Sequence, residues 1–199
     1  MLKTPEGSIQ ALKDRIIKEG QNLGNGILKV DSFINHQVDA VLMEACGKAF
    51  ADIFRHVGAT RVLTAEISGI APALMTAKFL DIPVVYARKN KPITMPDTVY
   101  LTVAPSHTKG NLTELIVSPD YLPTDSRVLI IDDFLASGAT IMGLVRLTQA
   151  AGASLVGIGS LIEKSFEGGR EALQHLGIPV RSLVTIASMD DGKFIFAAD

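Results

Sequence analysis

The chain has 199 residues, of which 47% are hydrophobic and 20% charged, so it can form one globular domain with a substantial core. Its net charge of −2 includes no basic surplus, which argues against nucleic-acid binding on composition alone. It has 1 cysteine, which excludes an intrachain disulfide, and no apolar run approaches ~18 residues, so we expect a cytoplasmic protein without membrane spans.

The N-terminal half of the chain alternates between helical and strand patterns. Ser8 is the expected N-cap of the first helix, whose apolar residues recur at helical spacing. Asp39 is the expected N-cap of the second helix, and Gly58 should end it. The patterns predict helices over 8–20, 39–56 and 70–80, and strands over 27–30, 61–65 and 83–87.

Two further strand patterns, over 98–104 and 112–118, have no helical segment between them. We expect these strands to be antiparallel, because a parallel connection needs a longer crossover. The loop between them carries Ser106 and Lys109 and is a candidate lid that excludes water from a reactive centre. A plain hairpin loop is the alternative.

The stretch over 127–140 has the most specific pattern in the chain. An apolar run at 128–131 is typical of a buried parallel strand, and Asp132 and Asp133 follow it directly. Carboxylates accept hydrogen bonds from hydroxyls or from a hydrated cation. The following loop has small residues, and Gly138 permits a positive φ, while amides at a helix start favour an anion. A diol beside a phosphate describes a ribose 5-phosphate, and a solvated strand end is the alternative.

The rest of the chain completes the predicted α/β fold. Its patterns indicate strands over 154–162 and 180–186, a helix over 169–176 and a short apolar tail over 194–196. Alternating strands and helices imply a central, mostly parallel sheet of about five strands flanked by helices.

Two other predicted strand ends carry candidate ligand groups. Ile67 and Ser68 lie in a turn whose backbone amides favour a phosphate. Arg88 and Lys89 follow another strand, where cations favour a pyrophosphate. Each signal is weak by itself, and the alternative for Arg88 and Lys89 is that they are solvated, as charged residues at a sheet edge usually are.

The 127–140 stretch resembles the phosphoribosyl-pyrophosphate motif of the type I phosphoribosyltransferase family. The resemblance implies one domain over 1–199, with a small hood from about 1–38 plus part of the C-terminal stretch. It implies Asp132 and Asp133 as the catalytic pair, Ala136, Ser137, Gly138, Ala139 and Thr140 as the loop that binds phosphoribosyl pyrophosphate, and Ile67, Ser68, Arg88 and Lys89 as pyrophosphate contacts.

The segments at 28–37 and 161–166 resemble the branch of this family that acts on xanthine. The resemblance implies base contacts from Leu28, Asn35 and Lys164, with Lys164 donating to a carbonyl oxygen of an oxopurine. A solvated strand-end lysine is the alternative. The implied reaction converts xanthine and phosphoribosyl pyrophosphate into xanthosine monophosphate and pyrophosphate. The implied protein is a homodimer that holds Mg²⁺ only through its substrate and through water near the acidic pair.

Ala136 departs from the hypoxanthine-guanine branch of the family, where an aspartate at this loop position can serve as general base. Alanine cannot do so, which leaves another base or direct reaction of the purine anion, a route that the acidity of xanthine favours. Two functional alternatives stay open. One is a phosphoribosyltransferase for another base, and the other is a regulator that senses phosphoribosyl pyrophosphate and binds nucleic acid.

Overall fold

The computed structural model describes residues 4–105, 112–190 and 193–197. The candidate lid residues Ser106 and Lys109 lie outside these ranges, and their role stays a prediction. The helices are α1 (Pro5–Glu19), α2 (Ala40–Phe54), α3 (Ile70–Leu80), α4 (Ala139–Ala150) and α5 (Gly169–Leu173). The strands are β1 (Gln21–Asn22), β2 (Leu28–Lys29), β3 (Arg61–Ala65), β4 (Val84–Ala87), β5 (Tyr100–Pro105), β6 (Leu112–Val117), β7 (Arg127–Leu135), β8 (Ser154–Lys164), β9 (Val180–Ser188) and β10 (Ile195–Phe196).

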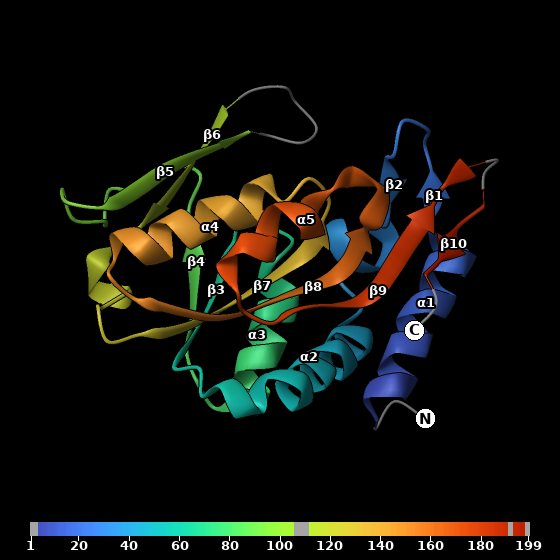
Figure 1. The fold of residues 1–199 in the computed structure, drawn as a ribbon, viewed down its shortest axis with the longest axis horizontal. Coiled ribbons are helices and arrows are strands. Elements are labelled where there is room, and N and C mark those ends of the chain that lie inside the picture. The colour runs from blue at the N-terminus through green and yellow to red at the C-terminus, as the bar shows by residue number, and fades with distance from the viewer. Residues whose placement is uncertain (1–3, 106–111, 191–192, 198–199) are drawn as a thin grey trace.

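A six-stranded sheet in the order β10-β9-β8-β7-β3-β4 forms the centre of the molecule (Figure 1). The strands from β9 to β4 are parallel to their neighbours, which confirms the predicted α/β fold with its mostly parallel sheet. The strand β10, from the predicted apolar tail, adds an antiparallel edge beside β9.

Helices cover both faces of the sheet, with α4 and α5 on one side and α2 and α3 on the other (Figure 1). Successive side chains of β7 therefore enter different parts of the core, because a strand alternates its side chains between the two faces. Val128 and Ile130 pack in the cluster that contains α4, whereas Leu129 and Ile131 pack in the cluster that contains α2.

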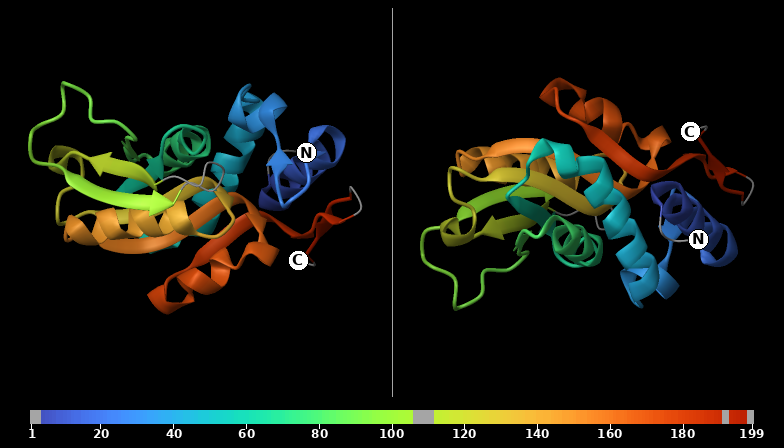
Figure 2. Two further views of the ribbon diagram at one scale, coloured as in Figure 1. Left: turned by 90° about the horizontal axis from the view of Figure 1, so that it is seen from above. Right: turned by 90° about the horizontal axis from the view of Figure 1, so that it is seen from below.

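The N-terminal segment lies at one end of this sheet. The hairpin β1–β2 and helix α1 lie near β9 and β10, and α1 and β10 lie side by side in both Figure 1 and Figure 2. A π-helical turn over Asp31–Asn35 leads from β2 toward α2. Leu12, Ile16 and Phe33 are buried in the same apolar cluster as α2, so this segment shares the core of the sheet.

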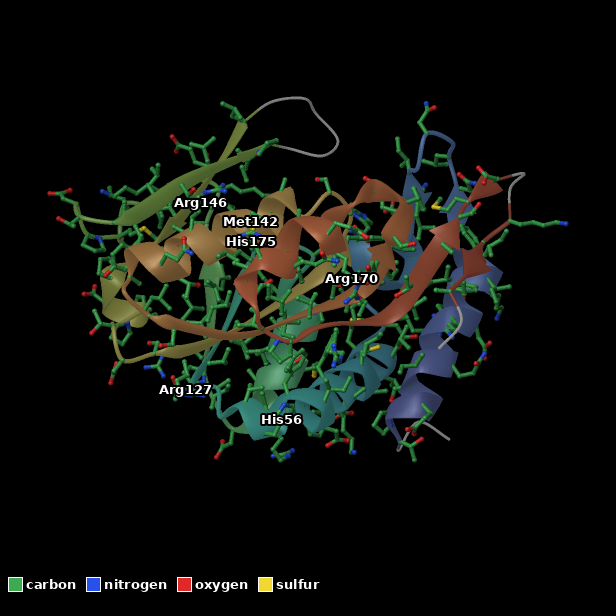
Figure 3. All side chains as sticks on the ribbon, viewed as in Figure 1. His56, Arg127, Met142, Arg146, Arg170 and His175 are labelled. Atoms are coloured by element: carbon green, nitrogen blue, oxygen red, sulfur yellow. The ribbon has the colours of Figure 1, made fainter. Side chains whose placement is uncertain are left out.

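Strands β5 and β6 pair antiparallel, as predicted, but they form a separate two-stranded sheet beside α4. Arg146 of α4 holds this ribbon, because its guanidinium donates to Thr102 Oγ1 at 2.9 Å and to the carbonyl of Val103 at 2.8 Å (Figure 3). The ribbon thereby forms a wall at the carboxyl edge of the central sheet.

Several predicted element boundaries differ from the structure, among them the end of β7 and the start of α1. Strand β7 does not end before the acidic pair but continues through Asp132 and Asp133 to Leu135, since β8 pairs with it as far as Leu135↔Glu163. Helix α1 begins at Pro5, not after Ser8, because the Thr4 side chain accepts from Gly7 N at 3.2 Å and proline is favoured at a first helical position.

Candidate active site

A cleft of about 330 Å³ opens at the carboxyl ends of β3 and β7. The N-terminal segment, the β5–β6 ribbon and the loop between β7 and α4 surround it. This is the edge at which parallel α/β sheets bind ligands, because the loops there are free to differ from the scaffold. Its lining includes Ile27, Leu28, Asn35, Glu66, Ile67, Ser68, Gly69, Lys89, Asp132, Asp133, Phe134, Ala136, Ser137, Gly138, Ala139, Thr140 and Lys164.

The acidic pair lies in the wall of the cleft, with one carboxyl buried and the other half-buried. Asp132 is 5% exposed, and its Oδ1 accepts from the backbone N–H of Asp133 at 3.0 Å. Burial, and next the charge of Asp133, raise the pKa of the Asp132 carboxyl well above its ordinary value. Cations or hydroxyl donors brought by a ligand would favour the ionised form of Asp132.

The loop of small residues turns the chain from β7 into α4. Gly138 occupies the N-cap position with φ of 79°, a conformation that a Cβ would strain. No described side chain caps α4 there, so the amides of its first turn remain available to an anion. All five predicted loop residues, 136–140, line the cleft.

A second turn, after β3, lies against the acidic pair. A Cβ added to Gly69 would clash with Asp132 Oδ1 and with Thr64 Oγ1, so the turn requires glycine for this approach. Thr64 is fully buried, and its hydroxyl has no hydrogen-bond partner within the described part of the chain. Ile67 is 75% exposed and Ser68 lines the cleft beside it, so this turn presents its backbone to a ligand.

The two predicted pyrophosphate cations are placed differently. Lys89 lines the cleft, whereas Arg88 lines a neighbouring pocket behind the turn. Glu66 connects them to the turn, because it accepts from the backbone of Lys89 at 2.6 Å and lies 3.0 Å from the Arg88 Nε. Lys89 therefore has direct access to a ligand, and Arg88 is placed to hold Glu66.

The three predicted base contacts, Leu28, Asn35 and Lys164, all line this cleft. Asn35 Nδ2 donates to Ser68 Oγ at 3.0 Å and to Asp133 Oδ2 at 3.1 Å, which connects the N-terminal segment to the turn after β3 and to the acidic pair. Lys164 is only 5% exposed, so the alternative of a solvated strand-end lysine is wrong. Its ammonium donates to the carbonyl of Gly26 at 2.9 Å and pairs with Glu167.

Sequence reasoning missed Phe134 and Glu66. Phe134 lines the cleft, and its ring centroid is 5.9 Å from the Lys164 ammonium. A predicted strand that continued past the acidic pair would have indicated Phe134, because it is two residues beyond Asp132 and thus on the same face of the strand. Glu66 gave no local signal, since its partners Lys89 and Arg88 are distant in the chain.

This arrangement is that of an α/β protein with a ligand-sized cleft at the carboxyl edge of its parallel sheet. The family model described as phosphoribosyl transferase domain matches residues 37–183, and the chain belongs to this family. Within the described ranges, no helix is long and apolar enough to cross a membrane.

Several relatives align over nearly the whole chain. The xanthine phosphoribosyltransferase of Deinococcus deserti is 49% identical over 92% of this chain and 95% of the relative. That of Oceanobacillus iheyensis is 46% identical over 94% of this chain and 97% of the relative.

Solved structures confirm the fold. The adenine phosphoribosyltransferase of Rhodothermus marinus superposes with a TM-score of 0.72 at 25% identity, over 90% of this chain and 98% of that chain. The Giardia lamblia enzyme, solved with 9-deazaadenine, has a TM-score of 0.73 at 19% identity over 89% of this chain and 98% of that chain.

Proposed function

We propose that the protein transfers the 5-phosphoribosyl group from phosphoribosyl pyrophosphate to xanthine, which yields xanthosine monophosphate and pyrophosphate. The observation that carries the proposal is the single cleft that contains the acidic pair, the loop 136–140 and the buried Lys164. The identity of 44–49% to relatives named for xanthine supports this choice of base.

Each part of the cleft then has a ligand group to bind. The amides of the loop 136–140 and of the first turn of α4 bind the 5-phosphate. Asp132 and Asp133 accept hydrogen bonds from the ribose hydroxyls. The turn at Ile67 and Ser68 binds the pyrophosphate, and Lys89 neutralises its charge.

In the reaction the bond from ribose C1 to the pyrophosphate oxygen breaks and a bond from C1 to a xanthine nitrogen forms. Positive charge develops on the sugar as pyrophosphate leaves with the bonding electrons. The protein contributes mainly position and electrostatic stabilisation, because the acidic pair lies beside that charge. Ala136 cannot act as a general base, and of the two routes that this leaves, another base or the purine anion, we propose the xanthine anion, whose proton goes to solvent.

Xanthine binds between the N-terminal segment and β8. The ammonium of Lys164 donates to a carbonyl oxygen of the base and stabilises the negative charge of its anion. The amide of Asn35 adds a donor or an acceptor, and Leu28 and Phe134 supply apolar surface for the ring. Xanthine has a carbonyl where guanine has an amino group, so a donor such as Lys164 favours xanthine.

The donor set of the cleft fits a substrate-bound Mg²⁺. The described residues contain no group of three or more histidine, cysteine or acidic side chains that could hold a metal. Mg²⁺ commonly uses only one or two carboxylates and takes its other ligands from phosphates and water. Asp132 and Asp133 would hold it through water, and the ion would neutralise the pyrophosphate charge.

The test is turnover of xanthine, guanine, hypoxanthine, adenine and orotate, each with phosphoribosyl pyrophosphate and Mg²⁺. We expect xanthine to have the highest kcat/KM, and the Asp132→Asn/Asp133→Asn double variant to lose most activity while staying folded. A preference for another base, or near-normal activity in the double variant, would contradict the proposal. A filter-binding assay with nucleic acid separates the enzyme from a regulator.

We also propose that the protein works as a homodimer in the cytoplasm, as the family resemblance implies. Sedimentation equilibrium gives the oligomeric state directly, and a monomer at micromolar concentration would overturn that part of the proposal.

A further inference from the structure

Behind the loop 136–140, on the side away from the cleft, lies an ion pair that the reaction itself does not use. Glu163 is on β8, next to Leu135 in the sheet register, and is only 1% exposed. Arg170 is in the short helix α5, and its side chain is 37% exposed. Neither residue lines the cleft, so neither can contact the substrate there.

The contact between Arg170 and Glu163 is bidentate and is supported by a third hydrogen bond. The Arg170 Nε donates to Glu163 Oε1 at 2.7 Å, and its Nη2 donates to Glu163 Oε2, which makes the contact bidentate. Ser182 Oγ also donates to Glu163 Oε2 at 2.6 Å. Burial by itself raises the pKa of Glu163, but the hydrogen bonds from Arg170 and Ser182 outweigh it and leave the pKa below its ordinary value. The carboxylate is therefore charged and satisfied.

Arg170 also binds α5 to the next strand, because its Nη1 donates to the carbonyl of Val180 at 3.1 Å. Helix α5 has 5 residues, too few to be stable without tertiary contacts. Its position thus depends on anchors such as Arg170 and the buried Leu173.

The start of α5 touches the phosphate loop directly. A Cβ on Gly169 would clash with the carbonyl of Ala136 and would lie 2.9 Å from Gly138 N, so the two backbones pack without space between them. Conversely, a Cβ on Gly138 would lie 3.3 Å from the carbonyl of Gly169. The loop lies between α5 on one side and the cleft on the other.

We propose that Glu163 and Arg170 are positioning residues for phosphoribosyl pyrophosphate: by fixing α5, they hold the loop 136–140 in the conformation that binds the 5-phosphate. The inference rests on the proposed function, because it takes that loop as the phosphate site. A displacement of about 1 Å in such a site can reduce rates or affinity by on the order of 100-fold.

The test compares Arg170→Met with Arg127→Met. Arg127, at the other end of β7, likewise donates to backbone carbonyls, those of Gly58 at 2.9 Å and Val57 at 2.7 Å, and lies far from Arg170 in Figure 3. We expect Arg170→Met to raise the Kd and KM for phosphoribosyl pyrophosphate by about 10-fold or more, with much smaller changes in kcat and in the KM for xanthine. Arg127→Met should lower stability and leave these constants near wild type.

Two further variants keep the result clear. Glu163→Met/Arg170→Met removes both charges, so it leaves no unpaired buried carboxylate and should fold, yet it should also bind phosphoribosyl pyrophosphate weakly. Arg170→Lys keeps one charge without the bidentate fork and should restore part of the affinity. Equal constants for the Arg170 and Arg127 variants at equal melting temperature would overturn the proposal. Calorimetric titration measures the Kd for phosphoribosyl pyrophosphate without turnover. It therefore tests the role of the loop 136–140 even if xanthine proves not to be the substrate.

Discussion

Lys164 is the residue that best explains a preference for xanthine. A buried ammonium needs acceptors, and within the described residues it has the Gly26 carbonyl and the Glu167 carboxylate. An ammonium has three N–H donors and no acceptor, so it can meet only an accepting edge of a base. At position 2 of the purine ring, xanthine has a carbonyl oxygen that accepts, guanine has an amino group that donates, and hypoxanthine has neither group.

Replacing this donor should change specificity. We expect Lys164→Met to lower kcat/KM for xanthine far more than for guanine or hypoxanthine, because a site built around a buried polar contact discriminates by up to ~10⁴-fold. Steady-state kinetics with the three bases measures this. The matched control is Lys89→Met, which removes a cleft cation from the pyrophosphate end and should lower kcat/KM similarly for all bases. A uniform fall in the Lys164 variant would assign that lysine a general structural role.

Lys164 and the acidic pair could be identified from the sequence because they are charged residues that directly follow apolar runs. The sequence could not reveal Glu66, whose partners Lys89 and Arg88 are distant in the chain. Nor could it separate Arg88 from Lys89, because adjacent residues at a strand end can project to different sides. Such pairings depend on three-dimensional proximity, which no local pattern contains.

The sequence predicted the succession of strand, loop and helix that β7 and α4 form, but it did not predict where β7 ends. Local pattern located the strand and the helix, but the end of β7 is set by β8, whose partner positions continue to Leu135↔Glu163. Propensity alone would end a strand at two aspartates, since aspartate is depleted in strands. The neighbouring strand overrides it and places both carboxylates in the cleft wall.

The loop between β7 and α4 can be tested by a pair of glycines. Gly138 and Gly177 both have positive φ, 79° and 63°, so alanine at either should cost about 1 kcal/mol of stability. A Cβ at Gly177 meets nothing within 4 Å, whereas one at Gly138 presses on the start of α5. We therefore expect Gly138→Ala alone to weaken phosphoribosyl pyrophosphate binding in calorimetric titration. Equal binding by both variants would mean that the loop only connects β7 to α4.

The junction of α1 and α2 depends on Asp39. Its Oδ1 accepts from Leu42 N at 3.0 Å as the N-cap of α2, and its Oδ2 lies 2.7 Å from Arg15 of α1. The bond from Leu42, followed by the charge of Arg15, holds the pKa of Asp39 below its ordinary value despite partial burial. Because the folded state favours the carboxylate, this group stabilises the protein above the unfolded pKa, and that stabilisation is lost as pH falls through the folded pKa.

Asp39→Asn should therefore destabilise the protein by about 0.5–1 kcal/mol at pH 7, since asparagine still caps a helix but carries no charge. At a pH below the lowered pKa of Asp39, the wild type protonates this carboxyl and the two proteins should become equal in this respect. Urea unfolding at both pH values measures the difference. Asp39→Ala, which also loses the cap, should remain less stable than wild type at both, and a constant gap for Asp39→Asn would contradict the charge interpretation.

Across the whole molecule, the alternation of patterns was sufficient to predict a parallel sheet with helices on both faces. It did not predict where the N-terminal segment packs, because that depends on side chains such as Phe33 and Leu12 meeting the core of distant strands. Polar contacts then join this segment to the rest of the fold: Asn35 to Ser68 and Asp133, Asn22 to the Met189 carbonyl, and Lys164 to the Gly26 carbonyl. The cleft lies between the parts that these contacts join.

A ligand in this cleft should therefore stabilise the whole fold. Binding only to the native state adds RT ln(1 + [L]/Kd), about 2.7 kcal/mol at a hundred times Kd, which corresponds to roughly 5–10 °C in melting temperature for a domain of this size. We expect this rise with phosphoribosyl pyrophosphate and Mg²⁺, measured by calorimetric melting. It should vanish in Asp132→Asn/Asp133→Asn, whose cleft is otherwise intact. An equal rise in that variant would place the ligand somewhere other than beside the acidic pair.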